Sequence, residues 1–166
     1  PVTKLYPEEF QKHIDIAESY INEDSTKARN AIDQIDFSLM NFTDSAEMRV
    51  ADYKIAFYNN HFSSKDVLAE LEILKNKALE NKDSLYYAYI YNRIIEVYLE
   101  HSKFEEVINI VPSILVIYEN RNMNNEIGEL LLKKGAAQYS IGDYINSIET
   151  VFEATDRFKE TNSTLH

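Results

Sequence analysis

Cysteine and tryptophan are absent from this chain of 166 residues, and glycine and proline occur three times each. Without cysteine the protein can form no disulfide, no thiolate metal site and no cysteine nucleophile, and the redox compartment stays open. The scarcity of glycine and proline is unfavourable for sandwiches and barrels, which need many tight turns, and favours helices joined by short links. No apolar run approaches the roughly 18 residues of a membrane span. The composition therefore predicts a soluble, all-α domain.

Positive charge is also scarce, because 17 Lys and Arg side chains accompany 28 Asp and Glu, a formal net charge of −11. Such a surface repels phosphate backbones and anionic lipids, so we expect no direct contact with nucleic acid or membrane. A basic protein partner is compatible with it, although solubility alone also explains the excess. The sequence begins at Pro1 rather than Met and contains no signal segment. We therefore expect a processed protein or part of a larger one; its compartment stays open between cytoplasm and periplasm.

An internal repeat runs along most of the chain. Residues 135–148 combine a small residue in a first helix, a Gly-Asp-Tyr turn and a second amphipathic helix. The pattern returns 40 and 80 residues earlier in the chain. Within each copy the apolar positions are three or four residues apart, as residues on one helical face must be. The second-helix sets are Val67, Leu71, Leu74 and Ala78; Val107, Val111, Ile114 and Tyr118; and Ser147, Val151, Ala154 and Phe158. The first-helix sets are Val50, Ala51 and Ile55; Ile90, Tyr91 and Ile95; and Leu130, Leu131 and Gly135. One more shift, shorter by a single position, adds Ala28, Ile32, Ile35 and Leu39.

Signals for helix boundaries accompany the repeat. The segments Ser63–Asp66 and Ser102–Glu105 resemble capping boxes, and Gly142–Asp143 is typical of a helix stop followed by an N-cap. Pro112 falls in the middle of a second helix and should bend it, with or without a function. These signals predict helical hairpins at about 8–39, 44–80, 84–120 and 124–160.

The repeat resembles the tetratricopeptide family, with Ala154 at the place of the family's second-helix alanine. The 40-residue spacing is longer than the usual 34 and is similar to variants in bacterial transcriptional activators, peptide-pheromone receptors and sensor kinases. The resemblance implies an all-α, right-handed α-α superhelix (solenoid) of about four antiparallel hairpins, forming a single domain over residues 1–166. It also implies a non-catalytic scaffold that binds a protein or peptide.

No catalytic or metal-binding pattern is recognisable. None of His13, His61, His101 and His166 has a second His or Cys ligand three or four positions away. Since His61 and His101 occupy the same repeat position at the end of a first helix, helix-dipole capping explains them better than a metal. Three isolated glycines make no phosphate loop. We therefore expect neither an enzyme nor a cofactor or metal site, although a parent protein could carry a catalytic domain.

Candidate partner-binding residues follow from the resemblance, because first helices line the concave face of tetratricopeptide stacks. The candidates are Arg49, Asp52, Tyr53 and Asn59 in the second hairpin; Tyr86, Tyr89, Asn92, Arg93 and Glu96 in the third; and Lys133 and Tyr139 in the fourth. Tyrosine and arginine are common in interface hot spots, and asparagine can hydrogen-bond a peptide backbone in both directions. Tyr86 and Tyr89 fit packing between hairpins equally well. Asp52 and Glu96 are unfavourable for a receptor of C-terminal carboxylates.

The favoured function is a sensory or regulatory domain of a bacterial signalling protein, such as a diguanylate cyclase, histidine kinase or transcription regulator. A composition rich in Asn, Ile, Lys and Tyr is typical of AT-rich bacterial genomes. The last helix also keeps apolar Val151, Phe152, Ala154 and Phe158 with no polar capping helix after it, so a continuing chain, a partner or a second copy (a homodimer) should cover that face. The alternatives are a quorum-sensing receptor for peptide pheromones and a stand-alone assembly adaptor.

Overall fold

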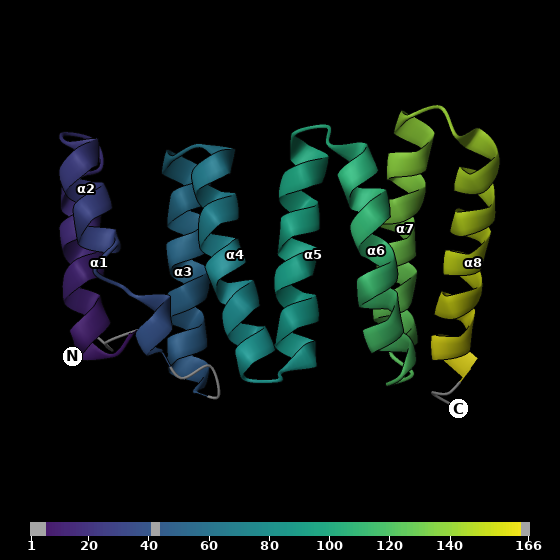
Figure 1. Ribbon diagram of the computed structural model, residues 1–166, viewed down its shortest axis with the longest axis horizontal. Coiled ribbons are helices and arrows are strands. Elements are labelled where there is room, and N and C mark those ends of the chain that lie inside the picture. The colour runs from purple at the N-terminus through teal and green to yellow at the C-terminus, as the bar shows by residue number, and fades with distance from the viewer. Residues whose placement is uncertain (1–5, 41–43, 164–166) are drawn as a thin grey trace. The chain divides into compact units, whose positions relative to one another are not determined.

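The computed structural model describes residues 6–40 and 44–163. Over these ranges the chain forms α-helices and one short 3-10 helix, with no strand (Figure 1), so the all-α prediction is confirmed. The elements are α1 (Glu8–Tyr20), α2 (Ser25–Ile32), η1 (Phe37–Leu39), α3 (Ser45–His61), α4 (Ser64–Glu80), α5 (Ser84–Glu100), α6 (Phe104–Glu119), α7 (Asn124–Ser140) and α8 (Tyr144–Ser163).

The described chain divides into two compact units. The N-terminal unit is Pro1–Lys77 and the C-terminal unit is Ala78–His166. In the C-terminal unit α5 packs against α6, α6 against α7 and α7 against α8, and Figure 1 shows these helices in chain order. In the N-terminal unit α1 packs against α2.

The first hairpin differs from the prediction at its C-terminal end, where α2 stops at Ile32 instead of continuing to Leu39. The N–H of Ile35 donates to the carbonyl of Ile32, which tightens the chain into a 3-10 turn. Asp36 then caps η1 by accepting from the N–H of Ser38. Leu39 consequently lies 83% exposed, whereas Ile35 is fully buried.

The turns of the C-terminal unit recur at a constant interval along the chain. Lys82, Ser102, Asn122 and Gly142 all have left-handed backbone, with φ between 53° and 84°. In each turn the N–H of that residue and the N–H of the next residue donate to carbonyls of the preceding helix, as from Gly142 to Tyr139 and from Asp143 to Gln138. This pair of backbone hydrogen bonds is the Schellman motif, which satisfies the free carbonyls at a helix end. The basic unit of the repeat is therefore one helix and its turn.

Helix capping follows the sequence signals in part. Ser63 and Asp66 form the predicted reciprocal cap, because the N–H of each residue donates to the side chain of the other. The capping box predicted at Ser102–Glu105 is wrong, because the left-handed turn uses Ser102 and makes Lys103 the N-cap, with no side-chain hydrogen bond. Pro112 lies inside α6, which is helical on both sides of it.

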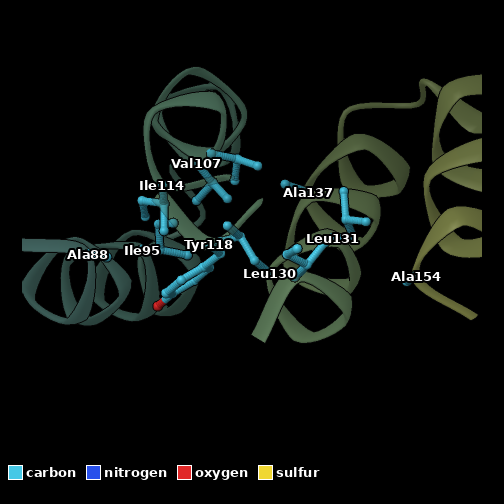
Figure 2. Close-up of a cluster of buried hydrophobic side chains, with 11 residues drawn as sticks. Ala88, Ile95, Val107, Ile114, Tyr118, Leu130, Leu131, Ala137 and Ala154 are labelled. Carbon is cyan, nitrogen blue, oxygen red and sulfur yellow. The ribbon is translucent and has the colours of Figure 1, made fainter. Parts of the chain in front are cut away.

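The apolar core of the C-terminal unit joins α5, α6, α7 and α8. Figure 2 shows Val107, Ile114 and Tyr118 of α6 beside Leu130 of α7. The aligned repeat positions provide this core: Val107, Val111, Ile114, Leu130, Leu131 and Ala154 are each at most 1% exposed. Helices α7 and α8 approach closely at two glycines, since a Cβ on Gly128 would come within 2.7 Å of the Phe158 ring, and one on Gly135 within 2.9 Å of Val151 Cγ2. The second-helix register therefore buries a continuous apolar face in α6, whereas in α8 its members include the polar Ser147 and Val151, which is 39% exposed.

Candidate functional site

A polar cluster joins α5 to α7 and contains four of the predicted binding residues. Lys133 Nζ donates to Asn92 Oδ1 at 2.8 Å and to Glu96 Oε1 at 3.3 Å. Arg93 Nε lies 3.9 Å from Glu96 Oε2. The two helices are separated by α6 in the sequence, so Lys133 holds first helices of successive hairpins together. We call Tyr89, Asn92, Arg93, Glu96 and Lys133, together with Leu132 and Tyr139, the α5–α7 surface.

Apolar side chains accompany these polar groups on the same two helices. Tyr89, Leu132 and Tyr139 are 38%, 42% and 64% exposed. Tyr139 packs edge-on against Tyr144, with ring centroids 5.2 Å apart. An arrangement of exposed aromatic and aliphatic groups around a satisfied ion pair can bind a polypeptide by contact area and by hydrogen bonds.

Tyr86 does not belong to the α5–α7 surface, because its side chain is buried, with 5% exposed. It stacks on Tyr89, with ring centroids 6.0 Å apart. Packing, the alternative that the sequence left open for both tyrosines, therefore applies to Tyr86, whereas Tyr89 keeps an exposed part.

The four candidates on α3 belong to the N-terminal unit. Arg49, Asp52 and Asn59 are exposed, and their spacing places them on one side of the helix. Tyr53 is half-buried and donates a hydrogen bond to Glu18 of α1. Burial, followed by this hydrogen bond, raises the pKa of Tyr53. Tyr53 thus fastens α1 to α3 and offers a partner only part of its ring.

The most unusual side chain of the N-terminal unit is one that the sequence reasoning missed. Lys54 has only 4% of its side chain exposed, and its Nζ lies 2.9 Å from Glu70 Oε2 on α4. The same ammonium donates to the carbonyl of Ile35 at 2.9 Å and lies 4.6 Å from the ring centroid of Phe37. A signal existed, because Lys54 stands in the middle of the apolar α3 set that contains Val50, Ala51, Ile55 and Tyr58.

Further charged groups extend the Lys54 contacts into a network. Arg29 Nη2 donates to Asp66 Oδ1 at 2.8 Å, which raises the pKa of the guanidinium. Hydrogen bonds from Ser63 and then from Arg29 lower the pKa of Asp66. Tyr58 donates to Asp33, and burial followed by that hydrogen bond raises the pKa of Tyr58. A hollow of about 260 Å³ is lined by Arg29, Asp33, Lys54, Tyr58 and Glu70, among others. Because Arg29 is paired with Asp66 and Lys54 with Glu70, we assign the network to packing between helices and not to a binding site.

Histidines and carboxylates form no metal-binding group among the residues that the structure describes. His101 is the C-cap of α5, with its ring Nδ1 2.9 Å from the carbonyl of Val97, and His61 ends α3 beside the ring of Phe57. Both positions agree with the helix-end interpretation. His13 lies in α1, and His166 is outside the described residues. None of the described helices is both long and apolar enough to cross a membrane.

Comparisons with protein-family models, with curated proteins and with solved structures find no match to this chain. What this chain binds is therefore inferred from the geometry of its own residues.

Proposed function

We propose that this protein is a non-catalytic scaffold whose α5–α7 surface binds another protein or a peptide. The observation that carries the proposal is the bridge from Lys133 to Asn92 and Glu96, which makes one surface out of two first helices. Because the bridge uses Asn92 Oδ1, the amide Nδ2 of that residue can still donate to a backbone carbonyl of a partner. Tyr89, Leu132 and Tyr139 supply contact area around it.

The finer proposal is a tetratricopeptide-like right-handed superhelix that serves as the sensory or regulatory domain of a bacterial signalling protein. Its support is the regular helix-and-turn period of the C-terminal unit, since a period is typical of solenoids. Within the C-terminal unit, the Schellman turns at Ser102, Asn122 and Gly142 repeat one hydrogen-bond geometry between successive helices.

The experiment uses a photo-crosslinking amino acid at position 89 in cells that produce the protein, with the same substitution at position 20 as a control. Tyr20 is 36% exposed, close to the 38% of Tyr89, and belongs to α1. We expect a polypeptide that crosslinks from position 89 and not from position 20. Equal crosslinking from both positions would show that the tyrosine at 89 marks no specific surface.

Affinity for that purified partner then tests the residues. The double variant Tyr89→Ala, Arg93→Ala should bind at least about tenfold more weakly, because aromatic and arginine side chains dominate interface energies. The matched control Tyr20→Ala, Lys12→Ala removes the same number of aromatic and basic groups from α1 and should leave the affinity unchanged. Both variants should melt within a few degrees of the wild type. Equal affinity of the first variant and the wild type would contradict the proposal.

A further inference from the structure

The outer side of α8 carries the largest group of exposed apolar side chains in the described residues. Ile145, Ile148 and Phe152 are 75%, 58% and 67% exposed, and their spacing of three and four places them on one helix face. Ile141 and Tyr144, which are 46% and 57% exposed, extend the group toward the preceding turn. We call these five residues the α8 outer face. Contiguous apolar exposure on this scale is typical of a surface that a partner covers.

Two residues that the sequence placed on the uncovered face pack inward instead. Ala154 is fully buried, and Phe158 packs over Gly128 of α7. Ser147, also buried, donates a hydrogen bond from its hydroxyl to the carbonyl of Gly135 at 2.8 Å. Since these residues hold α8 on α7, Ile145, Ile148 and Phe152 remain exposed, whereas Tyr144 contacts Tyr139 of α7.

The repeat indicates what kind of structure fits this face. Helix α8 stands one full repeat after α6, which places Tyr144 and Ile148 at the positions of Phe104 and Ile108. Phe104 and Ile108 are half-buried against the apolar cluster of the C-terminal unit, and α6 packs against α5 and also against α7. Tyr144 and Ile148 thus stand where a second helix receives the next helix, whereas Ile145 and Phe152 replace the exposed Glu105 and Pro112 of α6 with apolar side chains and widen this surface. An α-helix with an apolar stripe is the complementary shape.

Acidic residues along one side of the α8 outer face favour a partner helix that carries basic residues. Glu149, Glu153 and Asp156 follow one another at spacings of four and three, so they form an acidic flank beside Ile145, Ile148 and Phe152. The bases near this flank are Arg157, 3.9 Å from Glu153, and Lys159, 3.3 Å from Asp156. Glu149 and Glu153 are exposed. A partner helix gains from Lys or Arg residues along the matching edge.

The same flank is unfavourable for a second copy of this chain. In an antiparallel pair of α8 helices related by a twofold axis, both acidic flanks lie on the same side and repel each other. Each copy also carries a formal net charge of −11, which opposes self-association.

We propose that the α8 outer face docks an amphipathic α-helix of another protein, with an aliphatic stripe against Ile145, Ile148 and Phe152 and basic residues against the acidic flank. This docking surface meets the α5–α7 surface where Tyr144 packs against Tyr139, but it shares no residue with that surface, and the proposal does not depend on binding there.

The probe is a fluorescein-labelled, amidated synthetic helix of five turns with leucine at positions spaced by three and four and lysine along one edge of the stripe. A second probe carries glutamate in place of each lysine. We expect the wild type at low salt to bind the lysine probe at least about tenfold more tightly than the glutamate probe, measured by fluorescence anisotropy. Equal binding of both probes would overturn the charge part of the proposal, and no binding of either would overturn the docking surface.

Variants locate the binding on α8. Ile148→Glu with Phe152→Glu should weaken binding of the lysine probe at least about tenfold, whereas Leu79→Glu with Val116→Glu should leave it unchanged. Leu79 and Val116 are 53% and 56% exposed and make a matched control. Tyr89→Ala with Arg93→Ala should also leave binding of the lysine probe unchanged. This variant distinguishes a failure of the α8 proposal from a failure of the α5–α7 proposal. Binding that survives the first variant, or is lost in the control, would overturn the assignment.

The association state tests the competing occupant. Size-exclusion chromatography with light scattering should give a monomer at about 100 μM, because the acidic flanks repel. A dimer that Ile148→Glu with Phe152→Glu dissociates would show that a second copy covers the α8 outer face and would overturn the proposal.

Discussion

The N-terminal and C-terminal units are both built from helices, yet their interiors are held in different ways. In the C-terminal unit an apolar cluster joins α5 to α8, and its turns recur at a constant interval with the same left-handed backbone. In the N-terminal unit a lysine with 4% of its side chain exposed binds a carboxylate on the next helix, and α2 is cut short by a 3-10 turn. The comparison teaches that helical periodicity can be kept while the chemistry of the interior changes.

Removing Lys54 should have the largest effect of any single change, and it should fall on the N-terminal unit. Lys54→Ala leaves Glu70 and the carbonyl of Ile35 without their buried partner, which should cost about 3–5 kcal/mol of unfolding free energy. Urea denaturation followed by circular dichroism measures the loss, and hydrogen exchange locates it in the N-terminal unit.

Two controls sharpen that prediction. Lys65→Ala removes an exposed lysine from α4 and should cost less than about 0.5 kcal/mol. Lys54→Met combined with Glu70→Leu removes both charges and should recover most of the loss. If Lys54→Ala costs no more than Lys65→Ala, the buried ion pair does not hold this unit.

The C-terminal unit should instead be destabilised by added side-chain volume between α7 and α8. Gly135→Leu places a side chain where even a Cβ comes within 2.9 Å of Val151 Cγ2, so the α7–α8 packing should lose about 2–3 kcal/mol. Ala136→Leu, at the exposed neighbouring position, should change stability by less than about 0.5 kcal/mol. Thermal and urea unfolding measure both, and equal effects at the two positions would show that the helices do not approach closely at Gly135.

Substitutions in the repeated turns should change the free energy of unfolding by smaller amounts, with a sign that depends on the substitution. Gly142 has φ of 84° with open space around it, so Gly142→Ala should cost about 1 kcal/mol through backbone strain alone. Ser102→Gly relieves the strain at φ of 57° and should stabilise by about 0.5 kcal/mol after the added entropy of the unfolded chain. Urea denaturation should therefore give changes in unfolding free energy of opposite sign for the two variants. A stabilising Gly142→Ala would show that the turn is not left-handed.

The smallest expected effect is the acid sensitivity of the N-terminal unit. The folded-state pKa of Asp66 is lowered by its bonds with Ser63 and Arg29, so its stabilising contribution is present above the unfolded pKa of about 3.9 and is lost as the pH falls through the lower folded value. Denaturation midpoints between pH 6 and pH 2.5 should therefore fall less steeply in Asp66→Asn than in the wild type. Asp143→Asn, in the C-terminal unit, serves as the control. Parallel slopes for wild type and Asp66→Asn would exclude the linkage.

Helix positions and much of the core could be predicted from the sequence, because many weak preferences add along a helix face. Val107, Val111 and Ile114 repeat at one register and are fully buried, as the repeat alignment requires. The α5–α7 surface was predictable in part, since Asn92, Arg93 and Glu96 share a face of α5 and lie with Lys133. The burial of Tyr86 could not be predicted, because which of two neighbouring tyrosines is buried depends on tertiary packing and not on sequence spacing.

The sequence by itself determined the helical class, the hairpin repeat and the buried face of α6, because those follow from local spacing; the shorter helix-and-turn period became apparent only from the backbone of the turns. Only the tertiary structure decided which charges meet. Lys54 Nζ binds a carbonyl 19 residues away, and Arg29 binds Asp66 across 37 residues. Such partners share no local pattern, so their pairing exists only once the helices have packed, and the same holds for the bridge from Lys133 to Asn92 and Glu96.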